Sequence, residues 1–140
     1  MNLYFAALLD SLSALLPFTL QFFPALILVL LLMKLYTMFT PHNEGQLIGD
    51  NNLAAATSYG GTLIGFGLPV ASALIDSVSF IDAMVWVVVA GLVQLGTFII
   101  FRMFHSSISD DINNGKIAPA LKLAAVSVLV GMLNAASMTY

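Results

Sequence analysis

Four long apolar stretches, separated by short polar segments, dominate the pattern of this chain. They run over about residues 15–39, 53–75, 81–104 and 119–138. A hydrocarbon core of about 30 Å needs about 20 apolar residues in a helix, so each stretch is long enough to cross a bilayer. The pattern therefore predicts an all-α polytopic membrane protein, with four transmembrane helices in a single membrane domain over residues 1–140.

The second and fourth stretches look like two copies of one helix placed 64 positions apart. Small residues recur at that spacing, since Ala54, Ala56, Gly67 and Ala71 are matched by Ala118, Ala120, Gly131 and Ala135. We therefore expect two helical hairpins, repeat 1 over about residues 15–75 and repeat 2 over about residues 81–139. Because each repeat has an even number of spans, its copies point the same way, as a parallel repeat.

Small side chains on one face of a helix let helices pack closely in lipid. The predicted packing positions lie on the second and fourth stretches: Thr57, Gly61, Gly65, Gly67, Ala71, Ser127, Gly131 and Ala135. These faces pack either within one protomer or against another subunit, and both interpretations stay open. The duplicated architecture favours a homo-oligomer.

The polar segments between the stretches predict turns and helix caps. Residues 41–45 and 109–115 are rich in the turn-forming residues Pro, Asn, Asp and Gly. Asn51 or Asn52 is the expected N-cap of the second helix, because an Asn side chain accepts a hydrogen bond from a free backbone N–H of the first turn.

All four basic residues fall on one side of the predicted bundle: Lys34, Arg102, Lys116 and Lys122. The positive-inside rule then places loops 40–52 and 105–118 in the cytoplasm and both termini outside it. No basic residue precedes the first stretch, which is far longer than the apolar part of a signal peptide, so cleavage is not predicted. Residues 3–16 instead suggest an interfacial helix before Pro17 begins the first span.

Composition agrees with a membrane protein and excludes other classes. Hydrophobic residues make up 60% of the 140 residues and charged residues only 8%, with a mean hydropathy of +1.00. Soluble domains carry about 25% charged residues. No basic cluster is present to bind nucleic acid. The lack of cysteine removes disulfides, thiolate catalysis and cysteine-based metal sites.

Two sets of polar side chains are candidate functional groups: an outer acidic rim of Asp10, Asp76 and Asp82, and a polar path of Asn134, Gln94 and Tyr59. In an oligomer, a ring of carboxylates concentrates cations at a pore mouth. The simpler interpretation of the rim is ordinary solvated charge. The polar path has a simpler interpretation as well, which is interhelical hydrogen bonding that fixes the bundle.

A third set of ionisable groups lies in the two cytoplasmic loops: His42, Glu44, His105, Asp110 and Asp111. Their spacing matches no metal-ligand pattern and no HExxH-like helix face. No nucleophile elbow or phosphate-binding loop accompanies them. The sequence therefore predicts no enzyme, no cofactor and no metal site.

The segments NLAAA (52–56), GFG (65–67), PVASA (69–73) and NAASMTY (134–140) resemble the YjfL-type bacterial inner-membrane family, also called domain of unknown function 350. The resemblance implies a small four-span protein of the bacterial inner membrane with no established activity. Genes of this family accompany membrane-stress proteins of the phage-shock type and polyamine-related enzymes, which suggests an envelope role. The family supplies no catalytic residue.

Two functional hypotheses follow for a protein embedded in the lipid bilayer. In the first, an oligomeric scaffold or envelope-stress component recruits a cytoplasmic membrane-stress partner through loops 40–52 and 105–118. In the second, an oligomeric channel or transporter passes a small cation or polyamine. The spans lack ionisable residues near their centres, which weakens proton-coupled transport because proton relays need them there.

Overall fold

The computed structural model describes residues 3–138, and every regular element among them is an α-helix. The helices are α1 (Leu3–Ser13), α2 (Leu15–Phe39), α3 (Glu44–Gly49), α4 (Leu53–Asp76), α5 (Phe80–Phe104), α6 (Ile108–Asn113) and α7 (Ile117–Ala136). Four stretches of this described region are long and apolar enough to cross a membrane: α1 with α2, then α4, α5 and α7. The predicted all-α, four-span class is confirmed.

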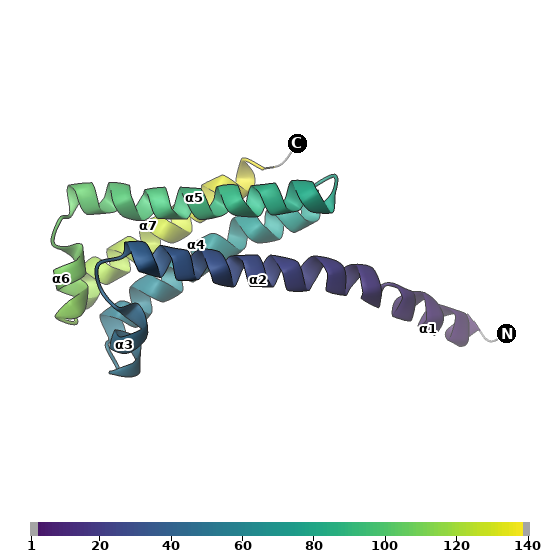
Figure 1. Cartoon of the computed structure of the whole chain (residues 1–140), viewed down its shortest axis with the longest axis horizontal. Helices are drawn as coiled ribbons and strands as arrows, with labels where there is room; N and C mark the ends of the chain where they lie inside the picture. Colours follow the sequence, from purple (N-terminus) through teal and green to yellow (C-terminus); the bar gives the residue numbers. More distant parts are fainter. Residues whose placement is uncertain (1–2, 139–140) are drawn as a thin grey trace.

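The four long helices lie alongside one another, with α3 and α6 at one end of the bundle (Figure 1). The first predicted repeat corresponds to α2 and α4, and the second to α5 and α7. Residue 139, where the second repeat is predicted to end, and residues 139 and 140 of the family motif lie outside the described residues. The parallel two-hairpin duplication stays a prediction.

Each cytoplasmic loop of the prediction contains a short helix that the turn-rich pattern did not reveal. Asn52 N–H donates to the carbonyl of Leu47 at 2.8 Å after α3, and Lys116 N–H donates to the carbonyl of Asp111 at 2.8 Å after α6. Each donor and each acceptor stands 64 positions from its counterpart. The two residues with positive φ, Asn51 at 60° and Gly115 at 72°, have the same separation. The 64-residue offset therefore extends from the helices into the connections.

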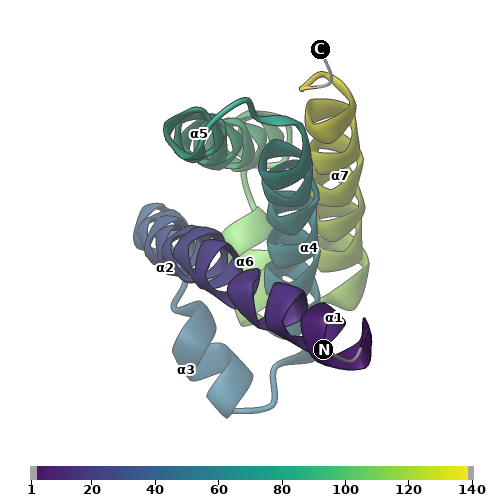
Figure 2. The same ribbon diagram turned by 90° about the vertical axis from the view of Figure 1, so that its right-hand side faces the viewer.

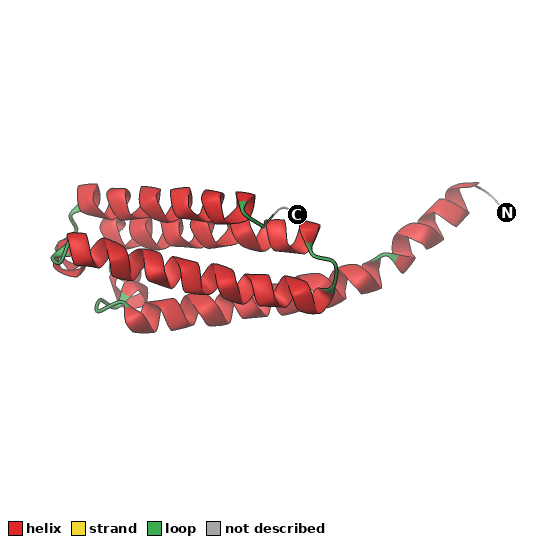
Figure 3. Cartoon of the chain, turned by 90° about the horizontal axis from the view of Figure 1, so that it is seen from above, coloured by secondary structure: helices red, strands yellow, loops and turns green. Residues whose placement is uncertain are grey.

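Helix α1 extends past the ends of the other long helices, and none of its residues is buried (Figure 3). The break between α1 and α2 falls at Ala14, whose backbone is itself near-helical. A proline ring clashes with the carbonyl four residues earlier. Pro17 therefore disturbs the helix at Ser13, where α1 ends. Helix α2 begins at Leu15, the first residue of the apolar stretch predicted over about residues 15–39.

Helices α4 and α7 form the most extensive helix pair, and the end-on view shows them side by side (Figure 2). A Cβ added at Gly61 would overlap Ala124, one at Gly65 would overlap the carbonyl of Ser127, and one at Gly131 would overlap the carbonyl of Gly65. These glycines let the two backbones approach closely, as expected for helices packing in lipid. We call this contact the α4–α7 seam.

Other predicted packing positions do not contribute to the seam. A Cβ at Gly67 would meet no atom within 4 Å, and Ala71 is exposed. Thr57 is half-buried and its hydroxyl donates to the carbonyl of Leu53 in its own helix, while Ala135 is half-buried. Gly67 therefore faces outward from the protomer, and its packing role stays a prediction about another subunit.

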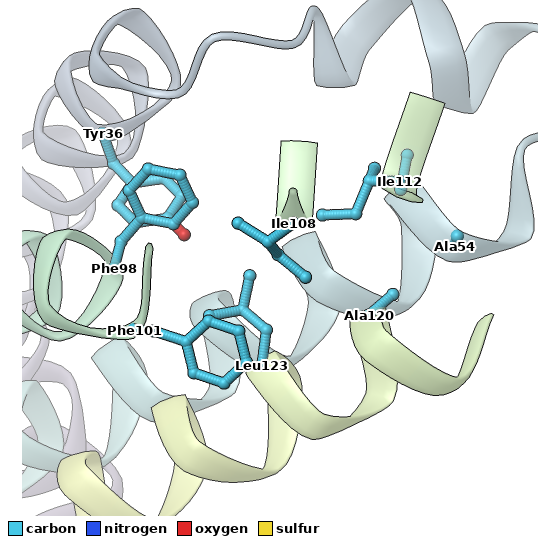
Figure 4. Packing of buried hydrophobic residues seen from close by; sticks show 9 residues of the cluster. Tyr36, Ala54, Phe98, Phe101, Ile108, Ile112, Ala120 and Leu123 are labelled. Atoms are coloured by element: carbon cyan, nitrogen blue, oxygen red, sulfur yellow. The ribbon is translucent and has the colours of Figure 1, made fainter. Parts of the chain in front are cut away.

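Buried apolar residues join α6 to the bundle, and the partly buried Leu47 joins α3 to the same cluster. Ile108 and Ile112, one helical turn apart on α6, are both fully buried against Phe101, Ala120 and Leu123 (Figure 4). A second core cluster around Phe66 and Val87 fills the other half of the bundle. The short helices are therefore packed parts of the fold rather than loose linkers.

Candidate functional site

Asp111 is the centre of a polar cluster on the α6 connection. One carboxylate oxygen lies 2.7 Å from Lys116 Nζ. The other lies 2.9 Å from His105 Nε2 and accepts a hydrogen bond from the Ser107 hydroxyl at 3.1 Å. The hydrogen bond from Lys116, followed by that from His105, lowers the pKa of Asp111 to about 2. The carboxylate is therefore ionised at any physiological pH and ties together the end of α5, α6 and the start of α7.

Asn52 connects the two loops directly. Its side-chain oxygen accepts from Ala55 N–H at 2.9 Å, so the predicted N-cap of α4 is confirmed. Its Nδ2 donates to the carbonyl of Ile112 at 2.8 Å, 60 residues away in the chain. Lys116, the N-cap residue of α7, forms no side-chain cap. The Asn52 side chain therefore both caps the start of α4 and holds the α6 connection against that helix.

The α3 connection contains a second polar cluster, which is buried. His42 and Glu44 are only 4% and 3% exposed. The Thr40 hydroxyl donates to Glu44 at 3.0 Å, and His42 Nε2 lies 3.4 Å from Glu44 Oε1, within ion-pair distance but without hydrogen-bond geometry. Burying a carboxylate is costly unless it is paired or hydrogen-bonded, and the Thr40 hydroxyl and the His42 ring are the groups that offset this cost for Glu44. Among His42, Glu44, His105, Asp110 and Asp111, the structure thus pairs each histidine with an acid of its own loop.

A polar hollow of about 740 Å³ opens beside this buried pair. It lies between α2, α3 and α4, and its lining includes Lys34, His42, Glu44 and Tyr59. The sequence pattern placed Tyr59 on a path with Asn134 and Gln94; the structure places it on this hollow instead. An acid, an imidazole, a phenol and an ammonium group share this hollow with apolar side chains such as Leu30 and Met33, so a ligand here would meet both polar and apolar surface.

Gln94 is a polar residue inside the bundle. It is 1% exposed, and its Nε2 donates to the carbonyl of Ser127 at 3.0 Å. A Cβ at Gly65 would stand 2.8 Å from that Nε2, so the absence of a side chain there leaves room for the amide. The predicted interhelical hydrogen bond is thus present, between α5 and the α4–α7 seam.

Asn134 and the acidic rim lie toward the opposite end. Asn134 is half-buried, and its Nδ2 is enclosed without a hydrogen-bond partner in residues 3–138. Asp76 accepts from the Ser72 hydroxyl at 3.0 Å, and Asp82 accepts from Val78 N–H at 3.2 Å. These two aspartates flank the α4–α5 turn, whereas Asp10 is carried by the projecting α1 (Figure 1). A three-carboxylate rim stays a prediction about an oligomer.

Within residues 3–138, no three His, Cys, Asp or Glu side chains are arranged to hold a metal ion. The His105–Asp111–Ser107 group has the residue types of an acyl-transfer triad, but both the histidine and the serine contact the same carboxylate oxygen. In such a triad the histidine stands between the acid and the serine. The cluster is therefore built to hold helices together rather than to activate a nucleophile.

The fold and these clusters define a small polytopic α-helical membrane protein without a recognisable catalytic centre among its described residues. The family described as Domain of Unknown Function (DUF350) matches residues 9–138. The UPF0719 inner membrane protein YjfL of Escherichia coli strain K12 is 37% identical over 133 residues, covering 95% of this chain and 98% of the relative. YjfL of Escherichia coli O157:H7 gives the same values. No solved structure matches the chain.

This protein belongs to the DUF350 family, as its segments at 52–56 and 134–140 suggested. The relatives are inner membrane proteins by name, and the four apolar helices agree with a multi-pass protein of that membrane. The family description assigns no activity.

Proposed function

We propose that this protein is a non-catalytic membrane scaffold of the bacterial envelope, which presents the combined surface of α3 and α6 to a cytoplasmic partner. The observation that carries the proposal is the 2.8 Å hydrogen bond from Asn52 to the carbonyl of Ile112, which joins the two connections. A connection that only links two spans needs no such bond. Loops held rigidly on a scaffold are where proteins place recognition surfaces.

The orientation needed for this role follows from the basic residues. Lys34, Arg102, Lys116 and Lys122 all lie toward the end of the bundle that carries α3 and α6, which the positive-inside rule assigns to the cytoplasm. Both termini then lie outside. A reporter fused after residue 140 is expected to be active only on the extracytoplasmic side, and a cytoplasmic signal alone would reverse the orientation.

The scaffold role is tested by placing a photo-cross-linker on α3. Ile48 is 36% exposed on α3, whereas Leu92 is 62% exposed in the middle of α5. In whole membranes we expect a protein cross-link from position 48 and none from position 92, and Asn52→Ala should weaken the cross-link from 48. Equal cross-linking from both positions, or none from position 48, contradicts a partner surface on α3 and α6.

A second candidate function, passage of a small cation, is favoured by one observation. Glu44 is a nearly buried carboxylate on a polar hollow that opens at the same end. Buried carboxylates attract cations at channel entrances. Purified protein in liposomes separates the two functions: the scaffold leaves vesicles tight, whereas a channel gives a cation flux that Glu44→Gln or Asn134→Leu abolishes.

The homo-oligomer is proposed to form through the outer face of α4 and α7. A shallow apolar groove of about 580 Å³ lies there, lined by small residues that include Thr57 and Gly60. A Cβ at Gly60 would meet no atom within 4 Å, so the protomer itself does not require glycine at this position. Gly60→Leu is expected to convert the oligomer into monomers in light scattering, while an unchanged mass contradicts this face.

A further inference from the structure

A groove between α5 and α7 combines an apolar wall with one positive end. It encloses about 560 Å³, and its lining runs from Val93 and Val130 near mid-span to His105 and Lys122 near the α6 end. Among the described residues, no Asp or Glu lines it. A Cβ at Gly96 would meet no atom within 4 Å, so the missing side chain keeps the middle of the groove open.

Lys122 has no acidic partner to neutralise it. Its Nζ lies 5.9 Å from the centre of the Phe101 ring, and within residues 3–138 it forms no salt bridge. The acidic cluster at Asp111, at the same end of the bundle, is already engaged by Lys116 and His105. Lys122 follows the start of α7 by five residues, or roughly 8 Å along the helix axis. An ammonium group at that depth reaches with its flexible stem toward the polar edge of the bilayer.

From this geometry we propose that the groove binds an anionic phospholipid, whose phosphate meets Lys122 and whose acyl chain occupies the apolar part along Gly96. Basic pockets between transmembrane helices are the sites at which anionic lipid head groups bind. The site lies in whichever leaflet faces α6, so it does not depend on the orientation of the protein.

A second copy of the chain fits this groove poorly. In a dimer whose axis follows the membrane normal, equivalent residues lie at equal depth, so two Lys122 side chains would face each other at the contact. Like charges at close range are repelled, whereas the phosphate of a lipid is attracted. The charge at the groove therefore selects the lipid over the subunit.

The test is lipid retention by native mass spectrometry, after incorporating the full chain into bilayers of equal phosphatidylglycerol and phosphatidylcholine. Lys122→Gln is expected to lower the preference for phosphatidylglycerol about fivefold. Its matched control is Arg102→Gln, which removes an exposed basic residue at the same end of the bundle, outside this groove, and should leave the preference unchanged.

The acyl chain is tested separately by filling the groove. Gly96→Leu should displace the retained lipid with no loss of folding, while Val85→Phe adds bulk to an exposed position of α5 outside the groove and should not. If Lys122→Gln loses the preference but Gly96→Leu keeps it, the lipid is attracted by surface charge and no acyl chain occupies the groove. That result would overturn the proposal. Displacement by inorganic phosphate, or a change of oligomer mass in Gly96→Leu, would do the same.

Discussion

The α3 and α6 connections share one backbone plan but differ in their chemistry. Both contain a six-residue helix, a residue with positive φ and the same closing hydrogen bond at 2.8 Å. The residues that form this closing bond differ, however. Its acceptor is Leu47 in the α3 connection and Asp111 in the α6 connection, and its donor is Asn52 in the first and Lys116 in the second. Backbone geometry recurs at the 64-residue offset while polar side chains do not, so function is best sought where the two connections differ.

The same contrast holds along the seam. Gly65 is enclosed between Ser127, Gly131 and Gln94, while its counterpart at the 64-residue offset, Leu129, is 55% exposed. Helix α4 and helix α7, the second helix of each predicted repeat, are thus related in sequence but do not use equivalent positions for packing. Four predictions test the differences along the seam and between the two connections.

The largest effect is expected from Gly65→Ala, because the added methyl group overlaps a backbone carbonyl that cannot move aside. Overpacking of this kind costs about 3 kcal/mol. The measurement is the unfolding free energy in detergent micelles, with Gly67→Ala as the control, since that methyl group enters open space. Equal stability of the two variants would mean that the seam is looser than described.

Asn52→Ala is expected to lose the α4 cap and the bond to Ile112 together, at about 1–2 kcal/mol. Lys116→Ala, at the matching position, should cost clearly less because that side chain is 60% exposed. Chemical unfolding of both variants under the same conditions measures the difference. If both lose the same amount, the two connections are energetically equivalent and their chemical divergence has no structural consequence.

Gly115→Ala is expected to cost about 1 kcal/mol, since a residue with a Cβ is strained at φ 72°. Gly115→Asn should cost less, because Asn tolerates this conformation and Asn51 adopts it at φ 60° in the other connection. Thermal unfolding midpoints give the ranking. If the alanine variant is as stable as the asparagine variant, the positive φ at residue 115 does not impose the requirement that Asn51 meets in the other turn.

The smallest effect concerns pH. The hydrogen bonds from Lys116 and His105 lower the pKa of Asp111 from 3.8 to about 2. Its contribution to stability is therefore complete above about pH 4 and is lost as the pH falls toward 2. Asp111→Asn should remove this part of the acid dependence in unfolding experiments between pH 5 and 2. A wild-type curve that coincides with the variant curve would show that these bonds do not persist in solution.

The sequence predicted the spans because each long apolar run has only one low-energy arrangement in a bilayer. It did not reveal α3 and α6, since a six-residue helix depends on what it packs against. Ile108 and Ile112 are spaced one helical turn apart, which is typical of a buried helix face, but the residues around them are polar and predict a turn. The burial of Glu44 was equally hidden, because α2 and α4 enclose it from outside its own segment. The sequence left Gln94 either on a polar path or in an interhelical hydrogen bond, because its acceptor, a main-chain carbonyl, has no signature in sequence.

The length of the first helical stretch has a consequence for the surrounding lipid. Residues 3–39 would measure about 55 Å as one continuous helix, nearly twice the hydrocarbon thickness of about 30 Å. Helix α2 alone, at 25 residues, suffices to cross. With the break at Ala14, α1 can turn into the interface, where its apolar side chains rest among lipid head groups and acyl chains. Membrane thickness would then set the angle between α1 and α2, so that hydrophobic mismatch acts on the bundle through its first helix.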